Sequence, residues 1–269
     1  MRFHAIQTDP IWEDPLPNRT AIERALDVCA PNEGEFVVLP ELCETGFSMR
    51  SDLVAHPGSV AWGSRLAKTH RIWLQCGIAR VHPDGGIANT ATIFDPSGSE
   101  VGVYEKTFLF TPGGEHLAYR PGRGAVVIDC AGVRIAPMIC YDLRFPELWR
   151  LALLAGAEVF TVGACWPMAR LAQKHAMIAS RAIENQAWIV SANRTGDEPS
   201  TRYSGGSTIV DFEGATKALL GSHIGFISQE IDLNELRSYR AKFRVISDIQ
   251  EKFLGPPPTG GQSKFSATH

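Results

Sequence analysis

Residues 133–150 constrain the fold of this chain more than any other stretch. An apolar run of strand length ends at Cys140, and a turn follows. Pro146 then suits the first turn of a helix, because its missing N–H would have no partner there, and Glu147 lies beside the positive end of the helix dipole. The stretch therefore predicts a sharp strand-to-helix bend that presents Cys140 at the carboxyl edge of a sheet, where α/β folds often place a nucleophile. Taken alone, a cysteine in an apolar run is more often buried and inert, and the case for Cys140 as a nucleophile depends on residues elsewhere in the chain.

Other apolar runs along the chain end in the same way, with polar or aromatic residues directly after the strand. In α/β folds, ligands bind at the carboxyl ends of strands, so these groups are expected to converge on one pocket. The groups that follow such runs are Glu41, Trp166 (after Cys165) and Asn193–Arg194, and Lys106 ends another strand.

Strands and helices alternate through the rest of the chain, which predicts an α/β fold of two sheets packed as a sandwich with helices outside. Residues 107–124 are expected to form a long loop, rich in Pro and Gly and without a rigid frame, and long loops in compact domains are usually functional. We expect one domain over residues 1–254 and a Pro/Gly-rich tail at 255–269, which is too polar and rigid to bury itself unless it packs on a partner subunit. The expected strands are 3–8, 36–39, 72–79, 89–94, 101–106, 125–130, 133–139, 158–163, 188–192, 207–211 and 225–231, and the expected helices are 18–30 (with Asn18 as N-cap), 59–70, 146–155, 169–186 and 233–241.

Charge and composition argue against several classes of function. The net charge of −3, with no Lys/Arg cluster on a plausible helix face, argues against nucleic-acid binding. The first residues lead into a strand-like run rather than a signal-peptide core, and the most apolar stretch, 151–164, is too short to span a bilayer. We therefore expect a cytoplasmic protein without membrane contact. The six cysteines and eight histidines show no metal-ligand spacing, so no metal or cofactor is expected, and the lack of a C-x-x-C pair disfavours a thiol redox protein.

A set of dispersed motifs resembles those of the nitrilase superfamily of carbon–nitrogen hydrolases. The resemblance runs from about residue 3 to residue 240, with the motifs in the family's order. The motifs are Pro40-Glu41 with Thr45-Gly46-Phe47, Tyr104-Glu105-Lys106, the Glu115 loop closing in Pro121-Gly122, Ile139-Cys140-Tyr141-Asp142-Leu143-Arg144-Phe145-Pro146-Glu147, Arg181 to Gln186, Ser191 to Gly196, and Tyr203 to Ser207.

The resemblance implies a four-layer αββα sandwich that pairs into a homodimer or a larger homo-oligomer. It also implies a catalytic triad of Glu41, Lys106 and Cys140, with Glu115 as a second glutamate. These residue types suit the chemistry, because a thiol must become a thiolate to attack and a nearby cation such as Lys106 favours that form. Glu41 can take the thiol proton, pass it to leaving ammonia and then activate water against a thioester. Lys106 and the backbone N–H of Tyr141 can hold the oxyanion, while Glu115 can hold Lys106 and tune Glu41.

Each assignment has a structural alternative. Glu44 competes with Glu41 as the reactive acid, although Glu41 directly follows its strand. A single lysine such as Lys106 is more often a solvated strand end. Phe110 and Trp166 are either walls of the substrate pocket or plain core aromatics.

The motifs around Glu115 and Cys140 are most similar to the omega-amidase branch of the family. That similarity implies a small substrate with a terminal amide and a distal carboxylate, such as 2-oxoglutaramate or 2-oxosuccinamate. Arg144 is the candidate for binding the carboxylate, and its alternative is a structural ion pair with Glu147 or another acid. Nitrilases and N-carbamoyl-amine hydrolases use the same three groups, so both stay open as alternatives, as does a non-catalytic interaction protein.

Overall fold

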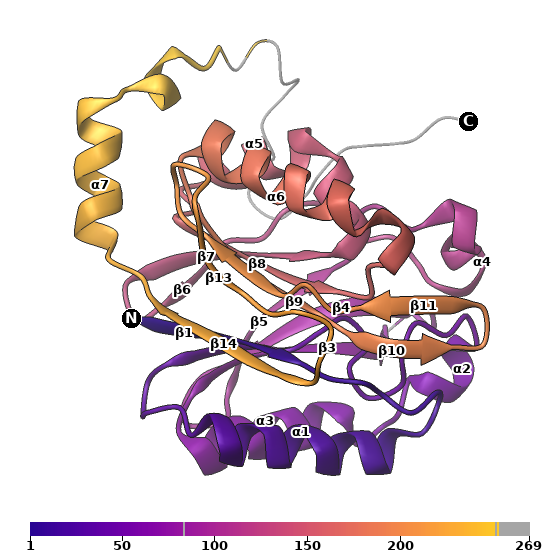
Figure 1. Cartoon of the computed structure of the whole chain (residues 1–269). Coiled ribbons are helices and arrows are strands. Elements are labelled where there is room, and N and C mark those ends of the chain that lie inside the picture. The colour runs from indigo at the N-terminus through magenta and orange to yellow at the C-terminus, as the bar shows by residue number, and fades with distance from the viewer. Residues whose placement is uncertain (83, 251, 253–269) are drawn as a thin grey trace.

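Two six-stranded sheets pack face to face and carry helices on their outer faces (Figure 1). The computed structural model describes residues 1–82, 84–250 and 252, so the tail expected at 255–269 lies outside the described residues. The αββα sandwich expected from the sequence is confirmed by this layering.

The first sheet has the strand order β14-β1-β2-β3-β4-β5. Its three central strands β1, β2 and β3 run parallel, and their neighbours are antiparallel. The β2 sequence Phe-Val-Val is buried on both faces, as a central strand of a covered sheet requires. The strands are β1 (Arg2–Gln7), β2 (Phe36–Val38), β3 (Trp73–Val81), β4 (Ile87–Phe94), β5 (Glu100–Glu105) and β14 (Gly225–Glu230).

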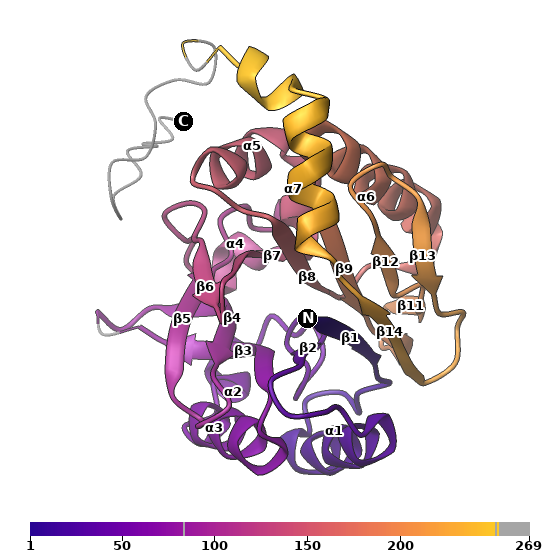
Figure 2. The ribbon, with the colours of Figure 1, turned by 90° about the vertical axis from the view of Figure 1, so that its left-hand side faces the viewer.

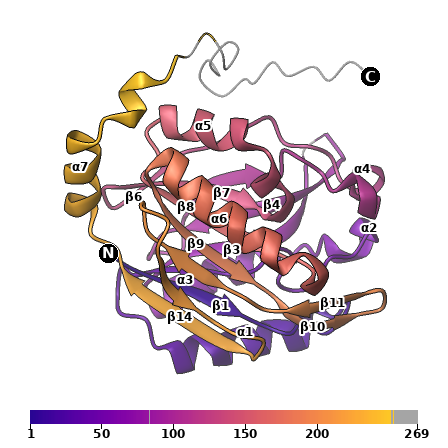
Figure 3. The same ribbon diagram turned by 45° about the horizontal axis from the view of Figure 1, so that its top comes forward.

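The second sheet has the order β13-β12-β9-β8-β7-β6, with β7, β8 and β9 parallel. A separate hairpin of β10 and β11 follows β9 at one end of this sheet (Figure 3). The strands are β6 (Ile128–Cys130), β7 (Val133–Ile139), β8 (Val159–Ala164), β9 (Trp188–Asn193), β10 (Thr195–Glu198), β11 (Thr201–Ser204), β12 (Thr208–Val210) and β13 (Thr216–Leu219).

Helices cover both outer faces of the sandwich. In Figure 2, α1 and α3 lie against the first sheet, whereas α5 and α6 lie against the second. The helix α7 lies at the side of the sandwich, and its Arg240 donates hydrogen bonds to the backbone oxygens of Gln186 and Ala157 at 2.8 and 3.1 Å. No described helix is both long and apolar enough to cross a membrane. The helices are α1 (Pro15–Cys29), α2 (Ser51–Val54), α3 (Ser59–His70), α4 (Glu115–Ala118), α5 (Pro146–Leu154), α6 (Leu171–Asn185) and α7 (Leu233–Lys242), with 3₁₀ turns η1 (Thr111–Gly113), η2 (Cys140–Arg144), η3 (Met168–Arg170) and η4 (Val245–Asp248).

Two expectations about element boundaries were wrong. The first helix begins at Pro15, and Asn18 is not its N-cap but a buried residue within it. The Asn18 amide instead donates to the backbone oxygens of Ile11 and Glu44 at 2.7 and 2.6 Å. The strand expected at 125–130 starts only at Ile128.

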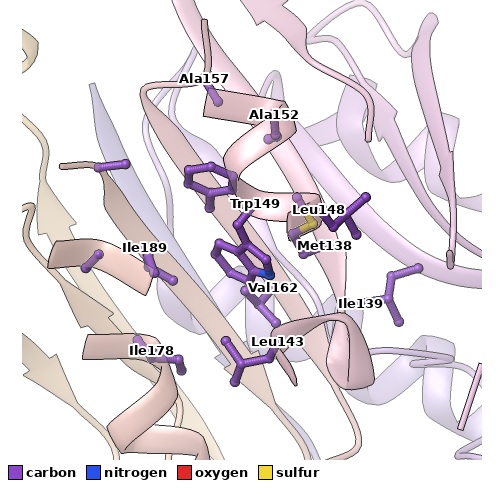
Figure 4. Close-up of a cluster of buried hydrophobic side chains, with 14 of the residues drawn as sticks. Met138, Ile139, Leu143, Leu148, Trp149, Ala152, Ala157, Val162, Ile178 and Ile189 are labelled. Carbon is purple, nitrogen blue, oxygen red and sulfur yellow. The ribbon is translucent and has the colours of Figure 1, made fainter. Parts of the chain in front are cut away.

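Apolar side chains fill the space between the sheets and beneath the helices. Phe3 and Phe36 of the first sheet stack at 5.2 Å between ring centroids, in a cluster shared with Ile135 and Val190 of the second sheet. Beneath α5 and α6, Trp149 lies among Met138, Leu148, Val162 and Ile178 (Figure 4). This packing fixes β7 and β8, whose carboxyl ends carry Cys140 and Cys165.

Lys174 is a charged exception on the buried face of α6. Its side chain is fully buried, and its Nζ donates to the backbone oxygen of Gly206 at 2.9 Å, while no carboxylate in the described part of the chain pairs with it. Burial lowers the pKa of Lys174 to about 7, against a smaller opposite effect of Cys140.

We expect Lys174→Met to raise the free energy of unfolding at pH 7 by roughly 1–4 kcal/mol, the range found when buried ionic groups are replaced by apolar ones. The folded protein loses the Lys174 proton near pH 7, whereas an unfolded lysine keeps it until a pH of about 10.4. The unfolded state therefore binds more protons between these values, the stability of the wild type rises with pH, and the advantage of the variant shrinks. Urea unfolding of both proteins at several pH values from 6.5 to 8.5 measures this difference, and an advantage that does not change with pH would contradict it.

Candidate active site

Glu41, Lys106 and Glu115 form one buried ionic cluster at the carboxyl ends of strands in the first sheet. Glu41 follows β2 and Lys106 follows β5 directly. Lys106 Nζ lies 2.7 Å from Glu41 Oε1, and 3.0 and 2.8 Å from the two carboxylate oxygens of Glu115. All three side chains are fully buried. Lys106 is thus not a solvated strand end, and an ammonium with three N–H donors can hold two carboxylates and still have a donor for a third group.

The Glu41 carboxylate is held by two further donors. Asn89 Nδ2 donates to Glu41 Oε1 at 2.8 Å and to Glu115 Oε1 at 2.9 Å. The backbone N–H of Cys165 donates to Glu41 Oε2 at 2.9 Å. Sequence reasoning missed Asn89, and the available signal was a polar amide within a strand, β4, that is buried almost throughout.

Glu115 has a frame that the sequence did not reveal. The segment expected to be an open loop contains η1 and the helix α4, and Glu115 is the first residue of α4. The backbone N–H of Phe110 donates to Glu115 Oε2 at 2.6 Å. The Glu115 carboxylate is therefore fixed by Phe110, Asn89 and Lys106 together.

Glu44, the alternative acid, is occupied elsewhere. Its two carboxylate oxygens accept from Arg19 Nε and from Ser59 Oγ, each at 2.5 Å. The geometry therefore places Glu41 rather than Glu44 beside Lys106.

Cys140 approaches the cluster from the second sheet. It follows β7, begins η2 and has a φ of 42°, a left-handed conformation that is uncommon outside glycine and is often found at functional sites. Its thiol hydrogen-bonds with Glu41, and the Cys165 N–H points to the sulfur. The two sheets thus contribute the sulfur and the acid separately.

The charges of the cluster act on one another. Burial raises the pKa of the Cys140 thiol well above its usual value, and Glu41 adds to this while Lys106 opposes it, so the resting sulfur is a thiol. For Lys106, burial acts to lower the pKa, but the charges of Glu41 and Glu115 outweigh it and hold the pKa well above the usual value. The site therefore holds the ammonium of Lys106 beside the neutral thiol of Cys140.

Asp142 connects the turn at Cys140 to the segment after Lys106. Its Oδ2 accepts from the backbone N–H of Ile139 at 2.9 Å and from the hydroxyl of Tyr104 at 2.7 Å, and its Oδ1 accepts from the backbone N–H of Phe108 at 3.0 Å. Burial raises the pKa of Asp142 to about 7, against the opposite effect of these hydrogen bonds. Sequence reasoning quoted Asp142 in a motif but gave it no role.

The reactive groups open onto a small cavity of about 80 Å³. The four residues predicted to contact substrate (Tyr141, Arg144, Phe110 and Trp166) all line it. The Arg144 guanidinium lies 4.9 Å from the Trp166 ring centroid and donates to Gln173 Oε1 at 2.8 Å. No described carboxylate pairs with Arg144, so the alternative of an ion pair with Glu147 is not what the structure shows.

Sequence reasoning gave no role to several residues of the pocket, although Phe47 and Tyr203 belong to the motifs that resemble the family. The hairpin of β10 and β11 supplies Thr201 and Tyr203, and its short polar strands carry no apolar alternation. Tyr203 donates to Glu198 Oε2 at 2.7 Å, and Glu198 is paired with the buried Arg194. Phe47 and Arg170 complete the wall, Phe47 with its ring centroid 5.1 Å from Lys106 Nζ.

No group of three or more His, Cys, Asp and Glu side chains among the described residues could hold a metal ion. The carboxylates of Glu41 and Glu115 are bonded to Lys106 and are not part of the lining. The thiol, hydroxyl and cationic residues that line the cavity are Cys140, Cys165, Tyr141, Thr201, Tyr203, Lys106, Arg144 and Arg170.

Comparison with known proteins places this geometry in context. The sequence pattern of the carbon–nitrogen hydrolase family matches residues 4–241. A 2-oxoglutaramate amidase of Bacillus subtilis (strain 168) is 34% identical over 221 residues, which cover 81% of this chain and 85% of the relative. An omega-amidase of Escherichia coli (strain K12) is 31% identical over 255 residues, covering 93% of this chain and 97% of the relative.

Solved structures show the same fold. A Xanthomonas campestris protein of the carbon–nitrogen hydrolase superfamily, whose structure has an arsenic adduct in the active site, superposes with a TM-score of 0.87 at 29% identity and covers 93% of this chain and 97% of its own. A Saccharomyces cerevisiae member of branch 10 of the nitrilase superfamily superposes with a TM-score of 0.80 at 27% identity, over 90% of this chain and 93% of its own.

Proposed function

The chain belongs to the carbon–nitrogen hydrolase family, and we propose that it is an omega-amidase that hydrolyses the terminal amide of small 2-oxo dicarboxylic acid monoamides, such as 2-oxoglutaramate and 2-oxosuccinamate. One observation carries the chemistry: the Cys140 thiol faces the buried Glu41–Lys106–Glu115 cluster in a cavity of small-molecule size. An interaction protein without catalysis has no need for such a cluster, because buried charges are costly to maintain.

In the first half of the reaction, Glu41 takes the proton of the Cys140 thiol as the sulfur attacks the amide carbon. The developing oxyanion accepts hydrogen bonds from the backbone N–H of Tyr141 and from Lys106, which turns one of its two N–H contacts with Glu115 toward the oxyanion. Glu41 then delivers the proton to the amide nitrogen, the carbon–nitrogen bond breaks, and ammonia leaves a thioester on Cys140.

In the second half, water attacks the thioester carbon and Glu41 accepts the proton of that water. The same two donors hold the oxyanion, the carbon–sulfur bond breaks, and the Cys140 sulfur regains a proton as the carboxylic acid leaves. Glu115 and Asn89 hold Lys106 and Glu41 in place throughout, which keeps the acid and the ammonium aligned in both steps.

Arg144 is the proposed partner of the distal carboxylate of the substrate. Its guanidinium lines the cavity, lies on the face of Trp166 and is bonded only to a neutral amide oxygen. A guanidinium can bind a carboxylate through two parallel hydrogen bonds, and a partly dry pocket makes such charged pairing necessary.

Two finer features of the protein are also part of the proposal. We propose a homodimer, or a larger homo-oligomer, as the resemblance to the family implies; exposed apolar side chains at Ile183 of α6 and Phe243 after α7 support an interface on that side. We propose a cytoplasmic location, which agrees with six free thiols in the chain. The molecular mass in solution and fractionation of cells test these two features.

The function is tested by ammonia release from a panel of omega-amides, nitriles and N-carbamoyl amines. We expect the 2-oxo acid monoamides to give the highest kcat/KM, with acid and ammonia as the only products. A nitrilase would prefer the nitriles, and an N-carbamoyl-amine hydrolase would also release carbon dioxide. Either result would overturn the omega-amidase assignment and leave the family assignment intact.

A further inference from the structure

The lining of the cavity carries cations but no carboxylates. Of the described residues that line it, Lys106, Arg144 and Arg170 are cationic, and none is acidic. Glu41 and Glu115 are not part of the lining and are both bonded to Lys106, and Glu198 is paired with Arg194. The cavity therefore offers an anionic substrate several donors and offers a substrate ammonium no counter-ion.

Arg170 is the cation whose donors are least used. Its guanidinium lies 5.7 Å from the Phe110 ring centroid, and no side chain or backbone oxygen among the described residues accepts a hydrogen bond from it. Its backbone oxygen accepts from Trp166 Nε1 at 2.8 Å, which fixes the η3 turn that carries Arg170. Arg144, by contrast, already donates one hydrogen bond to the side-chain oxygen of Gln173.

Arg144 and Arg170 both line the cavity, so each can bind a different polar group of a 2-oxo acid. If Arg144 binds the carboxylate, as in the proposed function, the substituent on the adjacent carbon C2 lies within the same lining, which also contains Arg170. An oxo oxygen at C2 accepts a hydrogen bond from a guanidinium, which has five donors and no acceptor. The ammonium of the corresponding 2-amino acid cannot do so, and it meets a like charge without a carboxylate to compensate.

We propose that Arg170 is a specificity-determining residue, which selects 2-oxo acid monoamides against their 2-amino analogues glutamine and asparagine. This inference rests on the proposed omega-amidase function and adds the residue that excludes the amino acids. The charge of Arg170 repels the ammonium of a 2-amino acid, and its hydrogen-bond donors attract the oxo oxygen of a 2-oxo acid. These two effects can be separated by substitution.

The test compares Arg170→Gln and Arg170→Lys with the wild type on 2-oxoglutaramate and on glutamine, by ammonia release. We expect Arg170→Gln to lower kcat/KM for 2-oxoglutaramate about 10–100-fold, mainly through KM, because it removes a bond to the bound substrate. The ratio of kcat/KM for 2-oxoglutaramate over glutamine is expected to fall at least about tenfold. Arg170→Lys keeps the charge and is expected to keep glutamine hydrolysis low while losing part of the 2-oxoglutaramate activity.

Arg202→Gln is the matched control. Arg202 lies on β11 between two residues that line the cavity, but its own side chain is 69% exposed and pairs with Asp197 outside the cavity. It is expected to leave both activities and their ratio unchanged. A purely structural effect of Arg170→Gln would lower both activities together.

The outcomes separate this inference from the function on which it rests. An active wild type whose substrate ratio survives Arg170→Gln overturns the role of Arg170 and leaves the omega-amidase function standing. A wild type that releases no ammonia from any omega-amide overturns both.

Discussion

Cys140→Ala is expected to abolish amide hydrolysis, with kcat falling by roughly 10⁴–10⁶-fold, as happens when the nucleophile of a coupled catalytic group is removed. In the proposed mechanism no other group forms the thioester, and no residue is assigned to activate water for direct attack on the amide carbon. The fold is expected to persist, because Cys140 is only partly buried and faces the cavity. Steady-state ammonia release and thermal unfolding together measure the two expectations.

The control for this variant is Cys165→Ala, in the same cavity. The catalytic contact of Cys165 is the backbone N–H that donates to Glu41, and alanine retains it. We therefore expect the Cys165 variant to keep activity within about tenfold of the wild type, since a single neutral hydrogen bond from its sulfur is lost. Intact mass of acid-quenched enzyme should show an acyl adduct on the wild type and on Cys165→Ala, and none on Cys140→Ala. Turnover that survived in Cys140→Ala would move the nucleophile elsewhere.

Glu41→Gln is expected to lower kcat by about 10³–10⁵-fold, because it removes the group that transfers protons in both halves of the reaction. Glutamine keeps the size of the side chain, but its NH₂ group then faces either Lys106 and Asn89 or the backbone N–H of Cys165, all of which are donors. The thiol, whose pKa is raised by burial, is left without a base. Pre-steady-state measurement of ammonia release and of acyl-enzyme resolves the two halves.

Glu115→Gln is the control for Glu41→Gln, because it removes the charge of the other carboxylate that is bonded to Lys106. Glu115 touches the same ammonium and the same Asn89 amide, but its remaining contact is the Phe110 N–H rather than the thiol. We expect a loss of about 10–100-fold, typical of a group that orients another one. Equal losses in the two variants would contradict the assignment of proton transfer to Glu41 alone.

The sequence predicted the parts of the site that depend on local order along the chain. Glu41 and Cys140 follow apolar runs and Lys106 ends another strand, and ligands in α/β folds bind at the carboxyl ends of strands, so their convergence could be inferred. The turn at Cys140 was also local, since Pro146 marks the start of the next helix.

The missed features depend on contacts between distant segments. Asn89 joins Glu41 to Glu115 across three elements, and Asp142 joins the second sheet to the chain after β5. The spacing of apolar residues along the sequence carries no information about such hydrogen bonds between distant side chains. Arg170 was missed because it lies on a single 3₁₀ turn, and Thr201 because the β11 sequence Thr-Arg-Tyr-Ser is too short and polar to be recognised as a strand.

Because Glu41 and Cys140 come from opposite sheets, activity should depend on how the two sheets dock during folding and unfolding. Glu41 and Lys106 end strands of one sheet, whereas Cys140 ends a strand of the other, and the apolar layer between the sheets sets their separation. Neither half of the sandwich has a working site by itself, so turnover is a direct reporter of docking between the halves. During refolding, activity should return only when that layer closes, even where far-ultraviolet circular dichroism already shows most of the strands and helices.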